Sequence, residues 1–320
     1  MSTVNMTSLV IITPVYEDVE ASSKLFNELY KSLGSDVYIV AVDDGSIRQP
    51  VDVASLQAAG LDGVIIQLKR NVGHQRAIAI GLNYVADNLP DATHVVVMDS
   101  DGEDLPETIK TLIEPLEQPD VDVVVAQRKS RVETLRFRAF YVVYKWIFQL
   151  LSGHKISFGN FMALKPNAVK RMAAMQELWI HVAGCVLTSK LRIGTCSLDR
   201  GPRYAGHSKM NFVGLALHGF KGLMVFAEDV LVRVGVACAF IAVFSVVGVI
   251  VAIALKILGI ATPGWFSIAL GILVLVFLQT GALTLMTLML TGVVKGGAVS
   301  PADYKVFVER VIHAKSDSAR

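Results

Sequence analysis

Residues 94–107 read HVVVMDSDGEDLPE, an apolar run that leads directly into a dense group of acidic residues. Four carboxylates, the acidic cluster, fall within six residues, at Asp99, Asp101, Glu103 and Asp104. Hard cations prefer oxygen ligands, and Mg²⁺ is commonly held by one or two carboxylates while substrate phosphates complete its coordination shell. The cluster therefore indicates a metal that binds a nucleotide diphosphate at the end of a strand. The alternative is an acidic surface turn before a helix, because Leu105-Pro106-Glu107 is typical of a helix start.

The first 126 residues alternate short apolar runs with helical patterns, which is typical of βαβ units and a parallel sheet. The predicted strands are residues 9–13, 37–42, 64–68, 94–98 and 122–126. The predicted helices are residues 19–33, 75–86 and 107–116. An α/β fold is therefore expected for this part of the chain.

Polar residues follow each of the first four predicted strands. They are Pro14-Val15-Tyr16-Glu17, Asp43-Asp44-Gly45-Ser46, Arg70-Asn71-Val72-Gly73-His74 and the acidic cluster. Ligands of open α/β sheets bind outside the carboxyl ends of the strands, so we expect these four segments to converge on one crevice. The convergence favours the metal site over the surface turn. His74 either touches a phosphate there or has a packing or capping role.

The composition excludes an ordinary soluble enzyme, because 53% of the 320 residues are hydrophobic, 18% are charged and the mean hydropathy is +0.51. Three cysteines, Cys185, Cys196 and Cys238, show no CxxC spacing. This argues against a zinc site and against a disulfide framework.

The excess of apolar residues lies near the C-terminus. No charge occurs in residues 234–255 or in residues 257–294, and Thr262-Pro263-Gly264 interrupts the second stretch. Roughly 20 apolar residues in a helix cross the ~30 Å hydrocarbon layer of a bilayer. Two transmembrane helices are therefore predicted, at about residues 230–257 and 265–292. Buried core helices of a soluble protein rarely run this long without a charge.

Basic residues predict the orientation of these spans. Lys221, Arg233 and Lys295 flank one side of the spans, whereas the turn at residues 257–264 carries no basic residue. Cytoplasmic loops carry the excess of Lys and Arg, so both termini are expected in the cytosol. Residues 1–8 lack the pattern of a signal peptide. We therefore expect a protein of the cytoplasmic (inner) membrane whose soluble part stays in the cytosol.

Residues 127–228 interleave basic and aromatic side chains. Between residues 137 and 151 the aromatic and aliphatic residues recur at spacings of three and four, which is typical of an amphipathic helix in the membrane interface. The alternative is an ordinary core-facing helix. Basic residues beside a membrane suit anionic lipid head groups, and we expect no nucleic-acid partner.

Several short segments in order resemble the GT-A fold of family 2 glycosyltransferases. They are VIITPVYEDVE at 10–20, VDDGS at 42–46, RNVGHQRA at 70–77 and MDSDGEDLPE at 98–107. Together with RYAGHSKM at 203–210 and the two spans, they resemble the polyprenyl-phosphate branch that includes dolichyl-phosphate mannose synthase. The resemblance covers residues 8–294. It implies a Rossmann-like GT-A cytosolic domain, juxtamembrane amphipathic helices and two C-terminal transmembrane helices.

The resemblance also implies a division of the chain into four regions. Residues 1–126 would form the nucleotide-sugar-binding GT-A core and residues 127–228 the acceptor-side region with interface helices. Residues 229–294 would form the two transmembrane helices and residues 295–320 a cytosolic tail, in which residues 304–312 carry the pattern of a short element.

Roles for single residues follow from the same resemblance. Pro14, Tyr16 and Glu17 would border the nucleotide base, and Asp43 or Asp44 would contact the base or ribose. The nucleotide pocket would be lined by Asn71, Gly73 and Gln75. Asp101 and Glu103 would hold Mg²⁺ or Mn²⁺, with Asp99 near the sugar or the water shell of the metal. Contacts with the acceptor phosphate or the diphosphate of the donor would come from Arg128, Arg138, Ser208 and Lys209.

Two departures from the family pattern are visible. Glu103 stands where the D-x-D-x-Q pattern has Gln, and its carboxylate oxygen suits a hard cation at least as well. Asn160-Phe161-Met162-Ala163 replaces the D-F-R-L segment of many relatives, so a carboxylate and a guanidinium are both absent. The second departure leaves the identity of the donor sugar open.

The expected reaction is an inverting transfer of a hexose from a UDP- or GDP-linked donor to a polyprenyl phosphate such as undecaprenyl phosphate. A phosphate monoester has a second pKa near 6, so the acceptor is mostly dianionic at neutral pH and needs no strong base. Positioning and electrostatics would do most of the catalysis, with Asp99, Asp101, Arg128, Arg138 and Lys209 as the catalytic group. A homo-oligomer is expected.

Two other functions remain open at this point. A processive polysaccharide synthase would usually carry a Q-x-x-R-W segment, but the nearest string, Gln176-Glu177-Leu178-Trp179, lacks the Arg. Two spans also argue against a polymer channel within one chain. A non-catalytic membrane protein that only binds nucleotide sugar is the second alternative, and the intact acidic cluster argues against it.

Overall fold

A computed structural model describes residues 9–128, 135–155, 158–204, 219–262, 264–296 and 303–315. The chain divides into two compact units. The first comprises residues 1–138, 156–225 and 301–320, and the second comprises residues 139–155 and 226–300.

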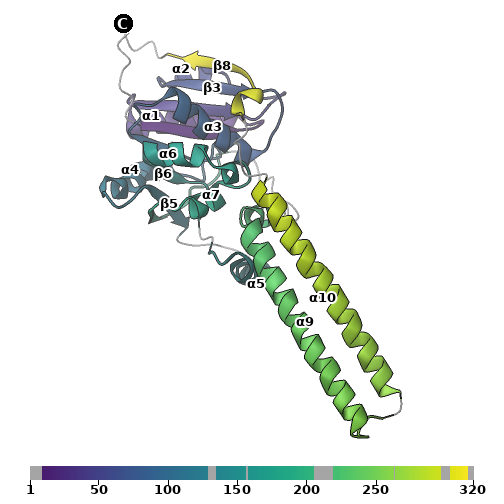
Figure 1. The fold of residues 1–320 in the computed structure, drawn as a ribbon. Helices are drawn as coiled ribbons and strands as arrows, with labels where there is room; N and C mark the ends of the chain where they lie inside the picture. Colours follow the sequence, from purple (N-terminus) through teal and green to yellow (C-terminus); the bar gives the residue numbers. More distant parts are fainter. Residues whose placement is uncertain are drawn as a thin grey trace. The chain divides into compact units, whose positions relative to one another are not determined.

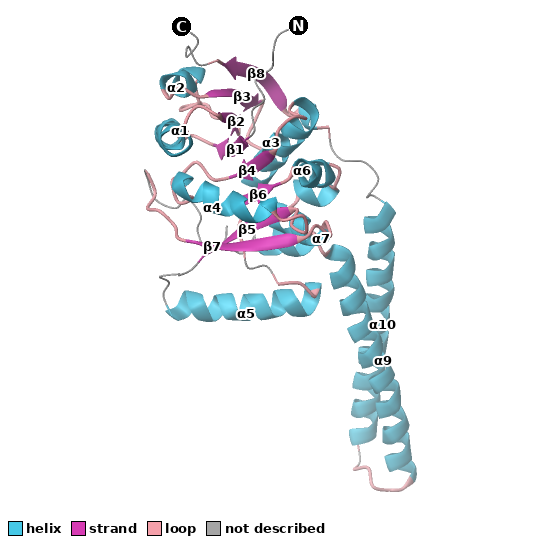
Figure 2. Cartoon of the chain, turned by 90° about the vertical axis from the view of Figure 1, so that its left-hand side faces the viewer, coloured by secondary structure: helices cyan, strands magenta, loops and turns pink. Residues whose placement is uncertain are grey.

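The first unit is built on an eight-stranded mixed sheet (Figure 1). Its strands lie in the order β7-β5-β6-β4-β1-β2-β3-β8 (Figure 2). The strands are β1 (Leu9–Val15), β2 (Val37–Asp43), β3 (Asp62–Leu68), β4 (His94–Val97), β5 (Val123–Arg128), β6 (Met162–Leu164), β7 (Ile193–Leu198) and β8 (Val308–Ala314). The four strands β4, β1, β2 and β3 pair in parallel, as predicted. All five predicted strands are confirmed, with ends that differ by at most two residues.

Helices cover both faces of this sheet (Figure 2). One face packs against α1 (Val19–Leu33), α2 (Val53–Ala58) and α4 (Ile109–Ile113), the other against α3 (His74–Asn88), α6 (Pro166–Ala173) and α7 (Val182–Thr188). Because successive strand residues point to opposite faces, Ile12 joins one core and Ile11 the other. Both faces are buried, which explains why the strands read as continuous apolar runs.

The ends of α1 illustrate how local sequence sets the helices. Asp18 precedes the helix and its Oδ1 accepts a hydrogen bond from the Ala21 N–H at 3.3 Å. Gly34 ends the helix with a φ of +79°.

The predicted helix over residues 19–33 is confirmed, and the one over 75–86 extends by one residue at its start and two at its end. The third is a composite of η1 (Pro106–Thr108), α4 and η2 (Glu114–Glu117), with Pro106 at the start of η1 and Pro115 at the change from α4 to η2.

Three strands escaped prediction. β6 is only three residues long and lies antiparallel between β4 and β5, so that Met162 pairs with Val97 on one side and Val125 on the other. β7 pairs in parallel with β5. The C-terminal segment, expected as a tail with a short element at residues 304–312, contains η4 (Tyr304–Val306) and β8, which pairs antiparallel with β3 at the edge of the sheet.

The residues just before β8 support the end of β3. The Lys69 N–H donates to the Phe307 carbonyl at 3.0 Å, and Lys69 Nζ donates to the Val306 carbonyl at 2.9 Å. The Phe307 ring lies 5.8 Å from the Trp179 ring, and Tyr304 is buried. The segment after the second long helix is thus part of the sheet domain.

Deletion of residues 303–320 is therefore expected to lower the Tm of the detergent-solubilised protein by about 5–10 °C, since an edge of β3 and an apolar contact would be exposed. Thermal unfolding followed by circular dichroism measures this shift. The matched control is Arg310→Ala, which removes only a side chain of β8 that bonds to Gln67. A deletion that unfolds at the same temperature as the control would show that β8 adds no stability.

The second unit contains two long apolar helices, α9 (Ala227–Ile257) and α10 (Trp265–Gly296). They pack side by side as an antiparallel hairpin (Figure 1). Each is long and apolar enough to cross a membrane, and large apolar side chains such as Phe240 and Phe244 are exposed. Small residues allow close contact, because a Cβ at Gly235 would lie 2.7 Å from Thr287 Oγ1. The two predicted apolar helices are confirmed, and their orientation in a membrane stays a prediction.

The amphipathic pattern at residues 137–151 forms a helix, α5 (Leu135–Ser152). Phe148 is buried and its ring lies 5.8 Å from that of Phe226. Val142, Trp146 and Leu150 are spaced by four and are all more than half exposed. This apolar stripe suits a lipid surface, although the position of α5 at a membrane interface stays a prediction.

Candidate functional site

The polar segments after β1, β2 and β3 meet at one end of the sheet. The Asp44 N–H donates to the Val15 carbonyl at 2.8 Å, which holds the first two segments together. An open pocket of about 130 Å³ lies here. Its lining residues are Pro14, Val15, Tyr16, Asp44, Asn71, Gly73 and His74. The structure thus brings together five of the residues predicted to contact a nucleotide, and adds Val15 and His74.

Two aspartates at the end of β2 hold the loops around this pocket, and Asp44 lines it. Asp43 accepts hydrogen bonds from the N–H groups of Ser46 at 2.9 Å and Val51 at 3.0 Å. Asp44 accepts from Val72 at 2.7 Å and Gly73 at 2.9 Å, so it ties the end of β2 to the segment after β3. Burial raises the pKa of Asp44, although these two amides act in the opposite direction. Direct contact of Asp43 or Asp44 with a base or ribose stays a prediction.

Glu17 has a structural role at the rim. It adopts a φ of +48°, and its carboxylate accepts hydrogen bonds from the N–H groups of residues 47, 48 and 49 at 2.8–3.2 Å. The amide of Ile47 has the largest effect and lowers the pKa of this carboxyl; burial opposes it, and the amides of Arg48 and Gln49 lower the pKa further. Glu17 therefore fixes the loop after β2, whereas Tyr16 is 45% exposed beside the pocket.

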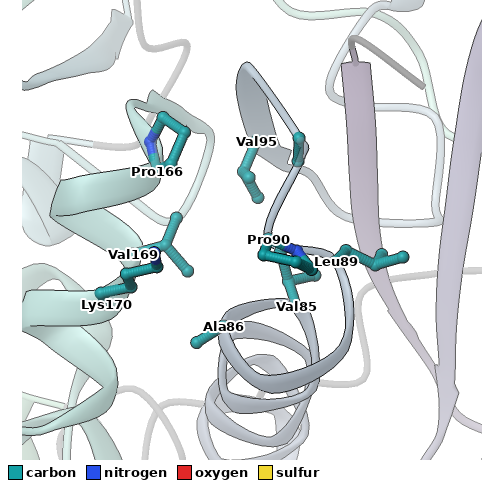
Figure 3. A pocket seen from close by; sticks show the side chains of 9 residues that line it. Val85, Ala86, Leu89, Pro90, Val95, Pro166, Val169 and Lys170 are labelled. Carbon is teal, nitrogen blue, oxygen red and sulfur yellow. The ribbon is translucent and has the colours of Figure 1, made fainter. Parts of the chain in front are cut away.

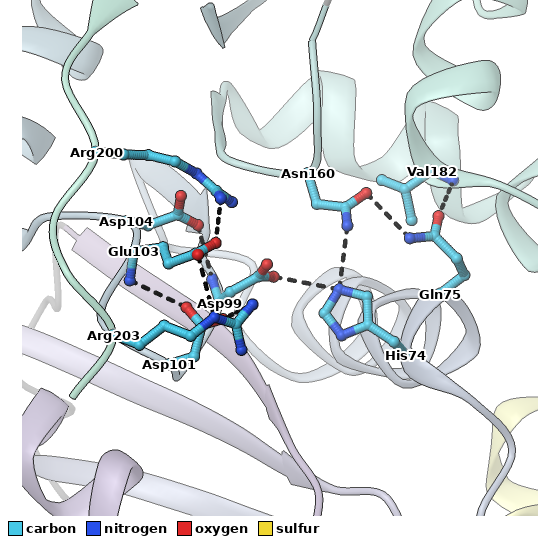
Figure 4. A network of polar contacts seen from close by, with 10 residues as sticks. All are labelled: His74, Gln75, Asp99, Asp101, Glu103, Asp104, Asn160, Val182, Arg200 and Arg203. Carbon is cyan, nitrogen blue, oxygen red and sulfur yellow. Dashed lines mark hydrogen bonds and ion pairs between the residues drawn. The ribbon is translucent and has the colours of Figure 1, made fainter. Parts of the chain in front are cut away.

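The acidic cluster follows β4, and its second and third carboxylates face two arginines (Figure 4). Arg203 Nη2 lies 3.0 Å from Asp101 Oδ2, and Arg203 Nε lies 3.1 Å from Glu103 Oε1. Arg200 pairs with the other oxygen of Glu103. No role was predicted for Arg200, and Arg203 was considered only as part of the RYAGHSKM motif. Two arginines close together in RGPR at 200–203, at the start of the RYAGHSKM motif, were the available signal.

A chain of polar contacts connects the cluster to the pocket (Figure 4). His74 Nε2 lies 3.2 Å from Asp99 Oδ1 and 3.1 Å from Asn160 Nδ2. Gln75 Nε2 donates to Asn160 Oδ1 at 3.1 Å, and Gln75 Oε1 accepts from the Val182 N–H at 2.7 Å. Gln75 is buried and is not among the residues that line the pocket. Its side-chain amide instead holds Asn160 in position. Asn160, the departure from the family pattern, stands beside His74 and Asp99.

Charge in this region shifts several pKa values. Burial lowers the pKa of His74, but the nearby Asp99, then Asp101 and Asp44, outweigh it and raise the pKa above its usual value. Burial and then Asp99 raise the pKa of Asp104 to about 7, although its Oδ2 accepts from the Asp99 N–H at 3.0 Å. Burial also raises the pKa of Asp101. The negative charge of the four carboxylates is therefore only partly compensated by Arg200 and Arg203.

The donor set suits a hard divalent cation, because Asp101 and Glu103 offer carboxylate oxygens on one turn. Within the described residues, no group of three or more His, Cys, Asp or Glu side chains is arranged to hold a metal. Both carboxylates are instead paired with arginines. Carboxylate ligands suit Mg²⁺ or Mn²⁺. In the described arrangement, however, the guanidinium groups of Arg200 and Arg203 contact these carboxylates.

Four further residues were predicted to contact phosphate groups. Arg128 is the last residue of β5, and Arg138 lies on α5; neither side chain is described. Ser208 and Lys209 lie outside the described residues. Their contacts with phosphate groups stay predictions.

A second hollow lies between α3 and α6 (Figure 3). Its walls are mainly apolar, including Val85, Leu89, Pro90 and Val169, and its volume is about 10 Å³. This space holds one water molecule at most, so it is a packing gap.

A mixed α/β sheet with an open pocket and an acidic turn at the carboxyl ends of its parallel strands has the architecture of a GT-A-like fold. The model of the family described as Glycosyl transferase family 2 matches residues 10–179, and the chain belongs to this family.

Several relatives, among them the following two, have a polyprenyl phosphate in their names. The undecaprenyl-phosphate 4-deoxy-4-formamido-L-arabinose transferase of Edwardsiella ictaluri (strain 93-146) is 29% identical over 174 residues, which are 52% of each chain. The dodecaprenyl-phosphate galacturonate synthase of Rhizobium johnstonii (strain DSM 114642 / LMG 32736 / 3841) is 26% identical, over 63% of this chain and 61% of that protein. The match thus spans about half the length of the first relative.

A solved structure has the same fold. The glucosyl-3-phosphoglycerate synthase of Mycobacterium tuberculosis, in complex with Mn²⁺, uridine diphosphate and phosphoglyceric acid, superposes with a TM-score of 0.51 at 14% identity. The superposition covers 71% of this chain and 78% of the other. It confirms the GT-A-like fold predicted from the ordered motifs.

Proposed function

We propose that this protein transfers a sugar from a UDP- or GDP-linked donor to a polyprenyl phosphate, with inversion at the anomeric carbon. The observation that carries the proposal is the acidic cluster beside a pocket walled by the ends of β1, β2 and β3. A chain with two helices of membrane-spanning length suits a lipid acceptor. The names of the relatives support a polyprenyl phosphate as the acceptor and leave the sugar open.

The acceptor phosphate would attack the anomeric carbon. A bond forms between that carbon and a phosphate oxygen while the bond to the donor diphosphate breaks, and the nucleoside diphosphate leaves. The acceptor is already mostly dianionic at neutral pH, so no carboxylate is needed as a strong base. The pocket would bind the nucleotide, Asp99 and its partner His74 would orient the sugar, and Arg128, Arg138, Ser208 and Lys209 would bind phosphate oxygens.

A divalent cation, Mg²⁺ or Mn²⁺, would be held by Asp101 and Glu103. The Mn²⁺ and uridine diphosphate named for the Mycobacterium tuberculosis enzyme support this part of the proposal. Bound there, the cation would neutralise charge on the leaving diphosphate. The protein would lie in the cytoplasmic membrane with the sheet domain and both termini in the cytosol, because Lys221, Arg233 and Lys295 flank one side of the spans and only Lys256 lies near the other. We also propose that it is a homo-oligomer.

The test uses purified full-length protein in detergent, undecaprenyl phosphate and a panel of radiolabelled UDP- and GDP-sugars. The panel includes a hexose, a hexuronic acid and a 4-amino-4-deoxypentose derivative. We expect one donor to give a lipid that carries a single sugar, with loss of turnover in EDTA and recovery with Mn²⁺. A growing polymer would instead support a processive synthase. Nucleotide-sugar binding without any lipid product would support a non-catalytic role, and turnover indifferent to EDTA would refute the metal.

A further inference from the structure

The segment Arg200–Tyr204 is docked directly on the turn that carries the two proposed metal ligands. Three of the four carboxylate oxygens of Asp101 and Glu103 face guanidinium groups of Arg200 and Arg203. The fourth, Asp101 Oδ1, accepts from the Glu103 N–H at 3.0 Å. All four oxygens therefore have donors from the chain itself.

Backbone contacts hold the same segment in place. The Gly201 N–H donates to the Glu103 carbonyl at 3.0 Å, and the Tyr204 N–H donates to the Asp101 carbonyl at 2.8 Å. The approach is close, because a Cβ at Gly102 would lie 2.6 Å from the Tyr204 ring, and one at Gly201 would lie 2.7 Å from the Gly102 carbonyl oxygen. The arginines thus reach the carboxylates from a segment that is bonded to the turn on both sides.

Arginines and a metal compete for these carboxylates. A divalent cation bound to Asp101 and Glu103 would stand within a few ångströms of two fixed positive charges, and like charges at this distance repel strongly in a partly buried site. The side chains of Asp101 and Glu103 are both 19% exposed, so solvent screens this repulsion only in part. Occupation by the metal and the described pairing with the arginines therefore exclude one another.

We propose that Arg200–Tyr204 is a metal-responsive latch, which closes the acidic cluster in the absence of a cation and is released when a divalent cation takes Asp101 and Glu103. The inference rests on the proposed function for its metal. Because the coupling between two binding events is reciprocal, the cation loosens the segment, and removal of the arginines tightens cation binding. The presence of Glu at position 103 matters here, since its carboxylate alone pairs with both arginines.

The first test is Mn²⁺ binding to full-length protein in detergent, measured by titration calorimetry without any substrate. We expect the variant R200Q/R203Q to bind Mn²⁺ about 10-fold more tightly than the wild type. The matched control is Arg192→Gln, which removes an arginine that pairs with Asp122 between β5 and β7, and should leave the affinity unchanged. Unchanged or weaker Mn²⁺ binding by the double variant, or no binding by either protein, overturns the latch.

The second test follows the segment itself by hydrogen exchange. Saturating Mn²⁺ should increase the exchange rates of the Gly201 and Tyr204 amides at least about 10-fold, while amides of β1 stay protected. Glu103→Gln should raise the same two rates without metal, since it removes the carboxylate shared by both arginines. Greater protection of these amides in Mn²⁺ would overturn the proposal. Release by Mn²⁺ in a protein that makes no lipid product would refute the proposed function while the latch stands.

Discussion

Asp101→Asn is expected to reduce sugar transfer by about 10²–10³-fold while the protein stays folded. The amide retains an oxygen that accepts from the Glu103 N–H, now 3.0 Å from Asp101 Oδ1, so the turn is preserved. The change removes the negative charge and places an NH₂ group against Arg203. Loss of one group that stabilises charge in a transition state typically costs this much in rate. The measurement is kcat for the lipid product at saturating donor and acceptor.

A matched substitution separates a specific effect from a general one. Asp122→Asn removes a carboxylate that also pairs with an arginine, Arg192, at 2.6 Å, but at the start of β5. We expect it to leave kcat within about twofold, because surface pairs contribute little. Near-normal turnover of Asp101→Asn, or equal losses in both variants, would contradict the assignment of Asp101 as a metal ligand.

The positions of the strands were accessible from the sequence because each is a short apolar run that ends in polar residues. A buried parallel strand needs apolar side chains on both faces, so Leu9–Val15 and Val37–Asp43 are clear in a single sequence. The convergence of the four polar segments followed from topology, since parallel strands place their carboxyl ends at one edge. This explains why five predicted pocket residues lie together.

The sheet edges and the arginine pairs were not accessible in the same way. β8 pairs with β3 across some 250 positions, from Gly63 to Ala314, and nothing local in either segment specifies this partner. β6 is too short for a period to appear. Arg203 meets Glu103 across 100 positions, and the choice of partner depends on how the chain returns after β7.

Side-chain roles within the pocket were the hardest to predict. Gln75 follows Gly73 and His74 at the start of α3, which suggested contact with the nucleotide. Helical geometry turns it inward, where its amide bonds to the Val182 N–H and to Asn160. A sequence shows that a polar residue is near a site, but a helix rotates adjacent residues by about 100°, so neighbours face different surroundings.

Gly45→Ala is expected to weaken nucleotide binding by more than about 100-fold and to lower the free energy of unfolding by about 2–4 kcal/mol. Gly45 has a φ of +71°, and a Cβ there would lie 2.5 Å from the Arg70 carbonyl carbon and 2.7 Å from the Asn71 nitrogen. Both neighbours are backbone atoms, so the segments after β2 and β3 must separate. That separation would break the hydrogen bonds from Val72 and Gly73 to Asp44, which form the pocket wall.

Gly34→Ala provides the comparison that isolates the clash. Gly34 also has a positive φ, +79°, but a Cβ there meets nothing within 4 Å, and the residue ends α1 outside the pocket. It should lower the free energy of unfolding by about 1–3 kcal/mol through backbone strain alone, with nucleotide affinity unchanged. Thermal unfolding and calorimetric titration with UDP and GDP measure both quantities. If the two variants bind nucleotide equally well, the close approach of the two segments at Gly45 is not what forms the pocket.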